Sequence, residues 1–157
     1  MADNFPFDFP HVFETPTVTV ATAAQDAETV IIAWLSTLGA CAAERHPGDP
    51  LPFRLVTQIA GNDDFELEIA HGLVSVHTMC DASLGRVAAR DAADATHNRL
   101  RELDRSRAPI TISTNRIGVI DYLRPVESPI WTPYTDQILR KTGRYEIGLS
   151  YVPTPVG

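Results

Sequence analysis

The stretch that most constrains the fold is "RYEIGLSYV", residues 144–152, which alternates between apolar and polar side chains without a break. Its apolar positions are Tyr145, Ile147, Leu149 and Tyr151. Successive side chains of a β-strand point to opposite faces of the sheet, so a period of two predicts a half-buried strand. One buried and one solvated face are typical of antiparallel sheets. We therefore expect a long, central antiparallel strand with a second layer over its apolar face.

Three other stretches have strand-like patterns: "LPFRLVTQIAG", "LVSVHTM" and "ITISTNRIGVIDYL". In the second of these, Ser75 and His77 fall on the face opposite the apolar side chains. The acidic segment "NDDFELEIAHG" is predicted to connect the first two strands, and the third is expected to break near Asn115. Three prolines between residues 125 and 137 predict a loop there, because proline lacks the backbone donor of a strand.

Two segments have the signals of helices. Residues 22–38 begin with Thr22 and Gln25 at capping-box spacing and end before Gly39. Residues 83–103 are rich in alanine, with Asp81 or Ser83 as the expected cap. The predicted inner face of this second helix consists of Leu84, Ala88, Ala92, Ala95 and Leu103.

The order of these elements predicts an α+β domain of two layers. We expect an antiparallel or mixed sheet of four to five strands, with two helices on one face. The chain of 157 residues is long enough for one hydrophobic core. The expected division is an extended arm over residues 1–21, one domain over residues 22–152 and a short tail over residues 153–157.

The N-terminal arm is rich in phenylalanine and proline. Phe5, Phe7, Phe9 and Phe13 alternate with prolines that exclude a helix. Aromatic side chains in an extended segment need a surface to pack against. Two interpretations remain open: a strap across the protein's own core, or an arm that docks on a neighbouring subunit.

Charge and hydropathy limit the partners and the location. No apolar run approaches the roughly 20 residues that cross a bilayer. The acidic N-terminus has no basic region of a secretory signal, so the chain is expected to stay in the cytoplasm of the cell that makes it. A net charge of -7 disfavours tight duplex binding but is compatible with DNA passing by.

The residues most suited to metal binding or catalysis are His77, Cys80 and His97. His77 and Cys80 have the spacing of one zinc-ligand pair, but a structural site needs a second pair, which is missing. Asp81 beside Cys80 is expected to raise the thiol pKa and weaken it as a nucleophile. We predict no catalytic residue, no metal and no cofactor; a small cytoplasmic metal protein or cysteine-dependent enzyme is the alternative from another class.

The arrangement of elements is more informative than any single residue. A strand runs directly into an alanine-rich helix in "VSVHTMCDASLGRVAARDAADATHNRLREL", and "ESPIWTPYTDQ" leads into the closing strand "ILRKTGRYEIGLSYV". Over residues 22–152 this arrangement resembles the tail terminator proteins of long-tailed, siphovirus-type bacteriophages, particularly those of actinobacteria. The arm lies outside the resemblance.

The resemblance implies a structural virion protein without enzymatic activity. Such proteins form a six-membered ring that caps the tail tube, stops its polymerisation and faces the neck of the capsid. The expected partners are other copies of the chain, the tail tube protein and a head–tail connector protein, with DNA only passing through the channel and no membrane. The chain would assemble in the host cytoplasm and remain in the virion; another connector component, a neck or stopper protein, is the closest alternative.

Two sets of residues follow as candidates for these contacts. Aromatic side chains near the closing strand and in the arm are expected at interfaces. Acidic side chains in the connector are expected either to line the channel or to form an ordinary solvated loop. The possible interface residues are Trp131, Tyr134, Phe5, Phe7, Phe9 and Phe13, and the possible channel-lining residues are Asp63, Asp64, Glu66 and Glu68.

Overall fold

A computed structural model describes residues 21–154, so the four phenylalanines of the arm lie outside the described residues. Within that range, the main sheet has five strands in the order β2-β3-β4-β8-β7. Their bounds are β2 (Cys41–Ala42), β3 (Phe53–Asp64), β4 (Ile69–Asp81), β7 (Ile120–Trp131) and β8 (Ile138–Ser150). β2 runs parallel to β3 and the other neighbours are antiparallel, which makes the sheet mixed, as predicted.

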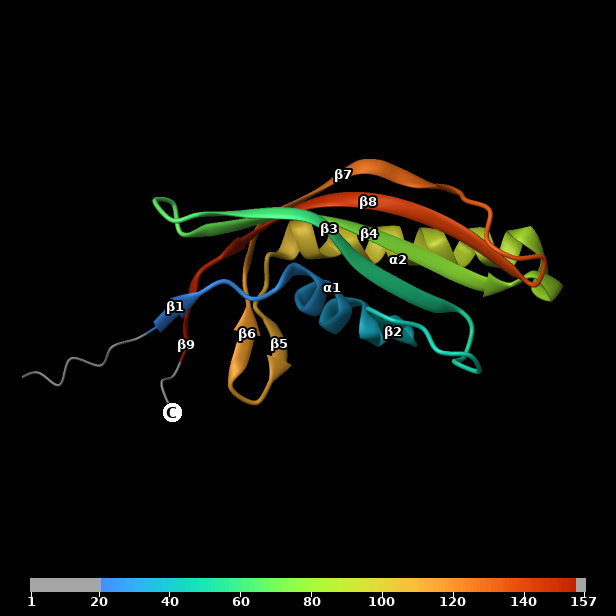
Figure 1. Cartoon of the computed structure of the whole chain (residues 1–157), viewed down its shortest axis with the longest axis horizontal. Helices are drawn as coiled ribbons and strands as arrows, with labels where there is room; N and C mark the ends of the chain where they lie inside the picture. Colours follow the sequence, from blue (N-terminus) through green and yellow to red (C-terminus); the bar gives the residue numbers. More distant parts are fainter. Residues whose placement is uncertain (1–20, 155–157) are drawn as a thin grey trace, which may run out of the picture.

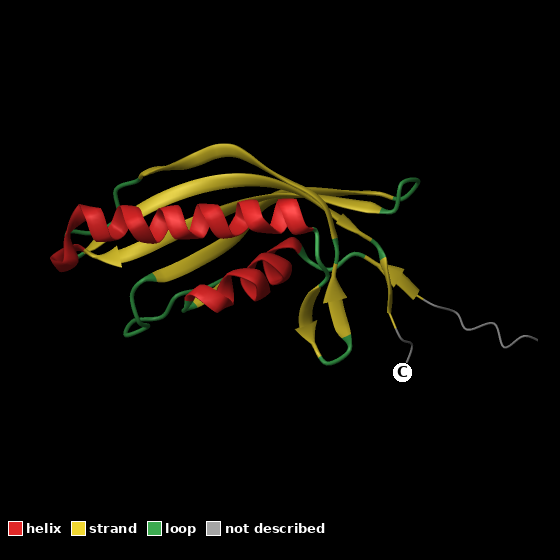
Figure 2. Ribbon diagram, turned by 180° about the vertical axis from the view of Figure 1, so that it is seen from behind, coloured by secondary structure: helices red, strands yellow, loops and turns green. Residues whose placement is uncertain are grey.

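Two helices cover one face of this sheet, and Figure 2 shows both on the same side. They are α1 (Ala27–Leu35), continued by the 3-10 turn η1 (Ser36–Leu38), and α2 (Gly85–Ser106), preceded by the 3-10 turn η2 (Ala82–Leu84). Two small antiparallel pairs complete the described chain: β1 (Ala21–Ala23) with β9 (Val152–Thr154), and β5 (Ile110–Ser113) with β6 (Arg116–Gly118). Figure 1 shows both pairs at one end of the molecule. The predicted two-layer α+β class is confirmed.

The closing strand is central, as its alternation predicted. β8 pairs along its length with β4 and β7. Its apolar side chains Tyr145, Ile147 and Leu149 are buried, with at most 2% of each exposed. They pack with α1 and α2 residues in one core that includes Val30, Ile31, Leu35, Leu100 and Leu103.

Both helices begin later than predicted. α1 is capped by Asp26, whose carboxylate accepts a hydrogen bond of 2.9 Å from the backbone N–H of Thr29. Residues 22 and 23, expected at the start of the helix, instead belong to β1, which pairs with residues 152–154. Pairing with a distant strand decided this boundary, and a local capping pattern contains no information about it.

The buried face of α2 also differs from the predicted stripe. Leu84 is 67% exposed, and the buried positions are Ala89, Ala93, Thr96, Leu100 and Leu103. Asp81 caps η2 by accepting from the backbone N–H of Ser83, and Gly85 follows with φ of 87°. Because this turn separates strand from helix, the helical phase could not be extrapolated from Leu84. The small side chains on the buried face do place α2 close to the sheet.

The proline-rich segment is an edge strand over most of its length, so the predicted loop over residues 125–137 is wrong. β7 continues through Pro125 and Pro129 to Trp131, with register shifts beside both prolines. β7 pairs with β8 alone, and an edge strand tolerates prolines because one row of its backbone groups has no partner strand. Edge position depends on the sheet order, which local sequence does not show.

The predicted acidic connector is largely a β-hairpin. Residues 62–64 pair with residues 69–71, so β3 and β4 extend well beyond the prediction and only residues 65–68 form the turn. Glu68 adopts the left-handed conformation with φ of 53°. Figure 1 shows this hairpin projecting at the end of the molecule opposite the start of α2.

No described helix is long and apolar enough to cross a membrane.

Candidate interaction surfaces

The fold keeps apart His77, Cys80 and His97, the three residues considered for metal binding or catalysis. His77 lies on the outer face of the sheet, where its ring nitrogens are 3.1 Å from Oγ of Ser75 and 3.0 Å from Oγ1 of Thr142. His97 belongs to α2, and its Nδ1 lies 2.8 Å from the Tyr145 hydroxyl. Cys80 is buried, with 4% exposed. Among residues 21–154 no group of three His, Cys, Asp or Glu side chains is arranged to hold a metal ion.

Burial controls the chemistry of both thiols. It raises the pKa of Cys41 to about 11 and also raises the pKa of Cys80, while the nearby Arg54 opposes both shifts. The prediction that Asp81 raises the pKa of Cys80 is wrong, because burial is what raises it. The Asp81 carboxylate is held by the backbone N–H of Ser83, which lowers its own pKa.

We expect slow alkylation of Cys41 in the folded protein. A pKa raised from 9.0 to about 11 lowers the thiolate fraction at pH 8 roughly 100-fold. Iodoacetamide labelling at pH 8, followed by peptide mass spectrometry, measures this rate in folded protein and in protein unfolded by urea. Equal rates in the two states would contradict the prediction.

The two histidines make stability depend on pH. Burial and then Arg140 and Arg144 lower the pKa of His77. Burial and then Arg101 lower the pKa of His97, with Asp94 opposing. The unfolded chain therefore binds these protons more readily than the folded chain.

We expect the free energy of unfolding to be highest above about pH 6.5, the ordinary histidine pKa. It should fall as the pH drops below that value through the lowered folded-state pKa values. Urea unfolding at pH 7.5 and at pH 5.5 measures the difference. The double variant His77→Gln, His97→Gln serves as the control, and an undiminished pH dependence in it would contradict the assignment.

One exposed surface is the hairpin tip, which we define as residues 63–68. Phe65 is 78% and Leu67 is 66% exposed, an unusual degree for apolar side chains. Oδ1 of Asp64 accepts hydrogen bonds from the backbone N–H groups of Glu66 at 3.1 Å and Leu67 at 3.0 Å, which stabilises the turn. All four predicted channel-lining carboxylates, Asp63, Asp64, Glu66 and Glu68, lie in the hairpin tip. The structure thus brings this predicted set together, around two apolar side chains.

A second surface is the aromatic hollow, which we define by Arg86, Trp131, Tyr134 and Arg140. It encloses about 300 Å³ between the start of α2 and the turn from β7 to β8. The Arg86 guanidinium lies 4.5 Å from the Trp131 ring centroid, and the Arg140 guanidinium lies 4.9 Å from the Tyr134 ring centroid. Arg140 also donates hydrogen bonds to Oγ1 of Thr132 and to the carbonyl of Pro133. The ring of Tyr134 remains 49% exposed.

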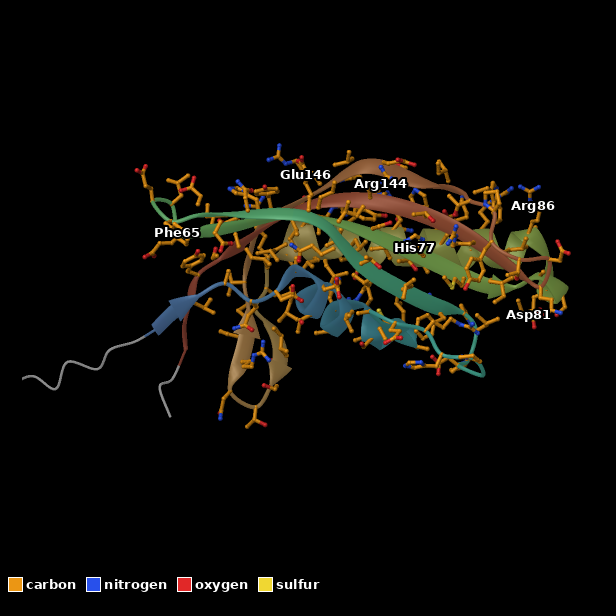
Figure 3. All side chains as sticks on the ribbon, in the orientation of Figure 1. Phe65, His77, Asp81, Arg86, Arg144 and Glu146 are labelled. Carbon is orange, nitrogen blue, oxygen red and sulfur yellow. The ribbon has the colours of Figure 1, made fainter. Side chains whose placement is uncertain are left out.

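Exposed apolar side chains stand close in the sequence to residues that line the aromatic hollow. Leu84 of η2 and Val87 of α2 lie within two positions of Arg86 and are each 67% exposed, and Ile130 of β7 precedes Trp131 and is 50% exposed. Figure 3 shows Arg86 and Phe65 at opposite ends of the long axis, so the hairpin tip and the aromatic hollow are well separated within one copy.

The sequence predicted only some of the residues of each surface. Phe65 and Leu67 alternate with the carboxylates in "DDFELE", and an apolar pair in a charged turn was a readable signal. Arg86 and Arg140 gave no local signal, because they reach the aromatic rings from different elements. Trp131 and Tyr134 were identified from sequence and do lie together beside the aromatic hollow.

Comparison with known proteins gives limited information. No protein-family model matches the chain, and no curated protein matches it. Among solved structures, the chain is similar to one in a structure described as "Virion of native gene transfer agent (GTA) particle". The identity is 18% and the TM-score 0.48, over 78% of this chain and 86% of the other. A likeness of this degree assigns no function.

Proposed function

We propose that the chain is a structural virion protein that forms a ring and terminates the tail of a long-tailed bacteriophage. The observation that supports this most is the concentration of exposed apolar and aromatic side chains at two ends of one sheet. Phe65 and Leu67 lie at one end, and Leu84, Val87 and Tyr134 lie at the other. Large exposed apolar groups are typical of surfaces that bind other proteins. The order of helices and strands, which resembles the tail terminators, supports the same proposal.

In this proposal the ring caps the last ring of tail tube protein and presents its other side to a head–tail connector protein. The ring has six copies, by resemblance to tail terminators. The chain assembles in the host cytoplasm and stays in the virion. The enzyme alternative is disfavoured, because His77 and His97 make separate hydrogen bonds and Cys80 is buried with a raised pKa.

Tail length in particles that lack the protein tests the proposal. A tail terminator stops tube polymerisation, so its loss should give overlong tails in electron micrographs. Expression of the wild-type chain in trans should restore a uniform length. Tails of normal length that fail to join heads would instead identify a neck or stopper protein.

The carboxylates of the hairpin tip have a proposed role of their own. In a ring, Asp63, Asp64, Glu66 and Glu68 would border the channel, where negative charge keeps passing DNA from adhering. A structure of the assembled ring with these side chains on its outer wall would rule this out. Channel lining requires the carboxylates to face the DNA and leaves Phe65 and Leu67 exposed to water, so it is an alternative to any contact that buries the hairpin tip against another protein.

We expect the arm to contribute to assembly rather than to the core. Deleting residues 1–16 should leave a folded domain, because a continuous core is present within residues 21–154. The truncated protein should self-associate more weakly or dock more weakly on its partners. Calorimetry and mass measurement test the two parts separately, and loss of the cooperative thermal transition would show that the arm belongs to the core.

A further inference from the structure

The hairpin tip and the aromatic hollow carry opposite charges, and both expose apolar or aromatic side chains. We propose that the hairpin tip of one copy docks in the aromatic hollow of the next copy, so that the chain assembles head to tail. This inference rests on the proposed function in one respect, that the protein forms a ring. The occupant of the aromatic hollow is thus a second copy of the same chain.

The charges of the two surfaces are opposite. The hairpin tip carries four carboxylates within six residues, and none of the ion pairs in residues 21–154 involves any of them. At the aromatic hollow, Lys141 lies 5.2 Å from the Trp131 ring, which adds a third cation to Arg86 and Arg140. Asp81 and Asp136 lie on the adjacent turns, so three cations stand against two carboxylates. The surplus at the aromatic hollow is therefore one positive charge.

The apolar side chains of the hairpin tip also match those of the aromatic hollow. A hollow of about 300 Å³ that is lined by Trp131 and Tyr134 has room for an aromatic side chain such as Phe65. Leu67 would then contact Leu84 or Val87, the exposed apolar side chains next to Arg86 in the sequence. Aromatic and arginine side chains are the most frequent energetic anchors of protein interfaces. Docking would remove from water the apolar side chains that are most exposed in the isolated copy.

The geometry requires a second copy. The hairpin tip and the aromatic hollow lie at opposite ends of the molecule, so a copy cannot fill its own hollow (Figure 3). The contact joins two different patches and is therefore heterologous. Repetition of a heterologous contact gives a closed ring when its rotation closes and an open filament when it does not.

Two variants with one blocked surface each test the contact. Phe65→Asp blocks the hairpin tip and leaves the aromatic hollow intact, and Arg86→Glu blocks the hollow and leaves the tip intact. An acid in the first turn of α2 suits the helix dipole, so Arg86→Glu should fold. Each variant alone should lose the oligomer that the wild type forms. Their equimolar mixture should give a species of twice 17.2 kDa and nothing larger, because one intact tip meets one intact hollow.

Matched controls carry the same chemical changes elsewhere. Ile117 is 44% exposed on β6, away from both surfaces, so Ile117→Asp should assemble as the wild type does. Arg101→Glu makes the same charge reversal on an exposed part of α2 and should also assemble normally. Light scattering after size exclusion gives the mass of each species, and thermal unfolding confirms that every variant is folded.

Several results would overturn the docking proposal. They are a full-size oligomer from either blocked variant, a mixture that contains only single chains, or a wild type that stays monomeric at every concentration. Tail length in particles lacking the protein judges the terminator function independently. If the copies associate through this contact but particles without the protein have tails of normal length, termination is rejected and the contact stands. If the tails are overlong but both blocked variants assemble like the wild type, the contact is rejected and termination stands.

Discussion

Replacement of Tyr145 by alanine should lower the free energy of unfolding by about 3–5 kcal/mol, the usual range for removing a buried aromatic side chain. Tyr145 is 2% exposed on the central strand β8 and belongs to the core formed with α1 and α2. The ring reaches α2, where its hydroxyl contacts Nδ1 of His97, so its removal leaves a cavity between β8 and α2. A domain is stable by only about 5–15 kcal/mol in total, so the variant would lose a large share of its stability.

Urea unfolding of the two variants Tyr145→Ala and Tyr145→Phe measures this effect. The phenylalanine variant keeps the ring and loses only the contact between the hydroxyl and Nδ1 of His97, 2.8 Å apart. Its cost should be about 1 kcal/mol, the typical net value of one hydrogen bond. Equal losses in the two variants would show that the hydroxyl, rather than ring packing, stabilises this region.

Replacement of Gly143 by alanine should have the second largest effect, about 1–3 kcal/mol, as expected for overpacking a filled core. A Cβ at position 143 would lie 2.8 Å from the hydroxyl oxygen and 3.0 Å from Cε2 of Tyr145. The Tyr145 ring is 2% exposed and packs in the core, and its hydroxyl contacts Nδ1 of His97. The added methyl group must therefore push the Tyr145 ring out of this packing and away from His97.

Gly148→Ala provides a comparison for this prediction. A Cβ there would approach Cε1 of the Tyr122 ring even more closely. Tyr122 is only partly buried and can rotate toward solvent at the cost of its contact with Nδ1 of His71, 2.7 Å away. We expect Gly143→Ala to lower the melting temperature more than Gly148→Ala does. The opposite order would show that side-chain burial does not govern the cost at these glycines.

Elements with a strong internal period were predictable from sequence. The alternation in residues 144–152 indicated a buried strand, and β8 has the predicted buried face. The alanine-rich segment indicated a helix close to the sheet, and α2 packs there through Ala89 and Ala93. These patterns are local consequences of backbone geometry, which repeats every two residues in a strand and every 3.6 in a helix.

Element boundaries and residue roles that depend on tertiary contacts could not be predicted from the local sequence. Pro125 and Pro129 lie in a strand because β7 is at the sheet edge, and Asp63 and Asp64 pair across a hairpin that reads locally as a loop. Burial raises the pKa of Cys80, and the neighbouring Asp81 in the sequence does not indicate that Cys80 is buried.

By itself the sequence determined the α+β class, the central strand, the helix next to the sheet and the grouping of acidic residues between two strands. The tertiary structure alone decided that these acidic residues lie at the end of a hairpin and that Phe65 and Leu67 between them are exposed. It also decided that Arg86 and Arg140 meet Trp131 and Tyr134. The physical reason is distance along the chain. Backbone periodicity acts between near neighbours, whereas a hollow forms only when packing brings together side chains 45 to 54 positions apart, as with Arg86, Trp131 and Arg140.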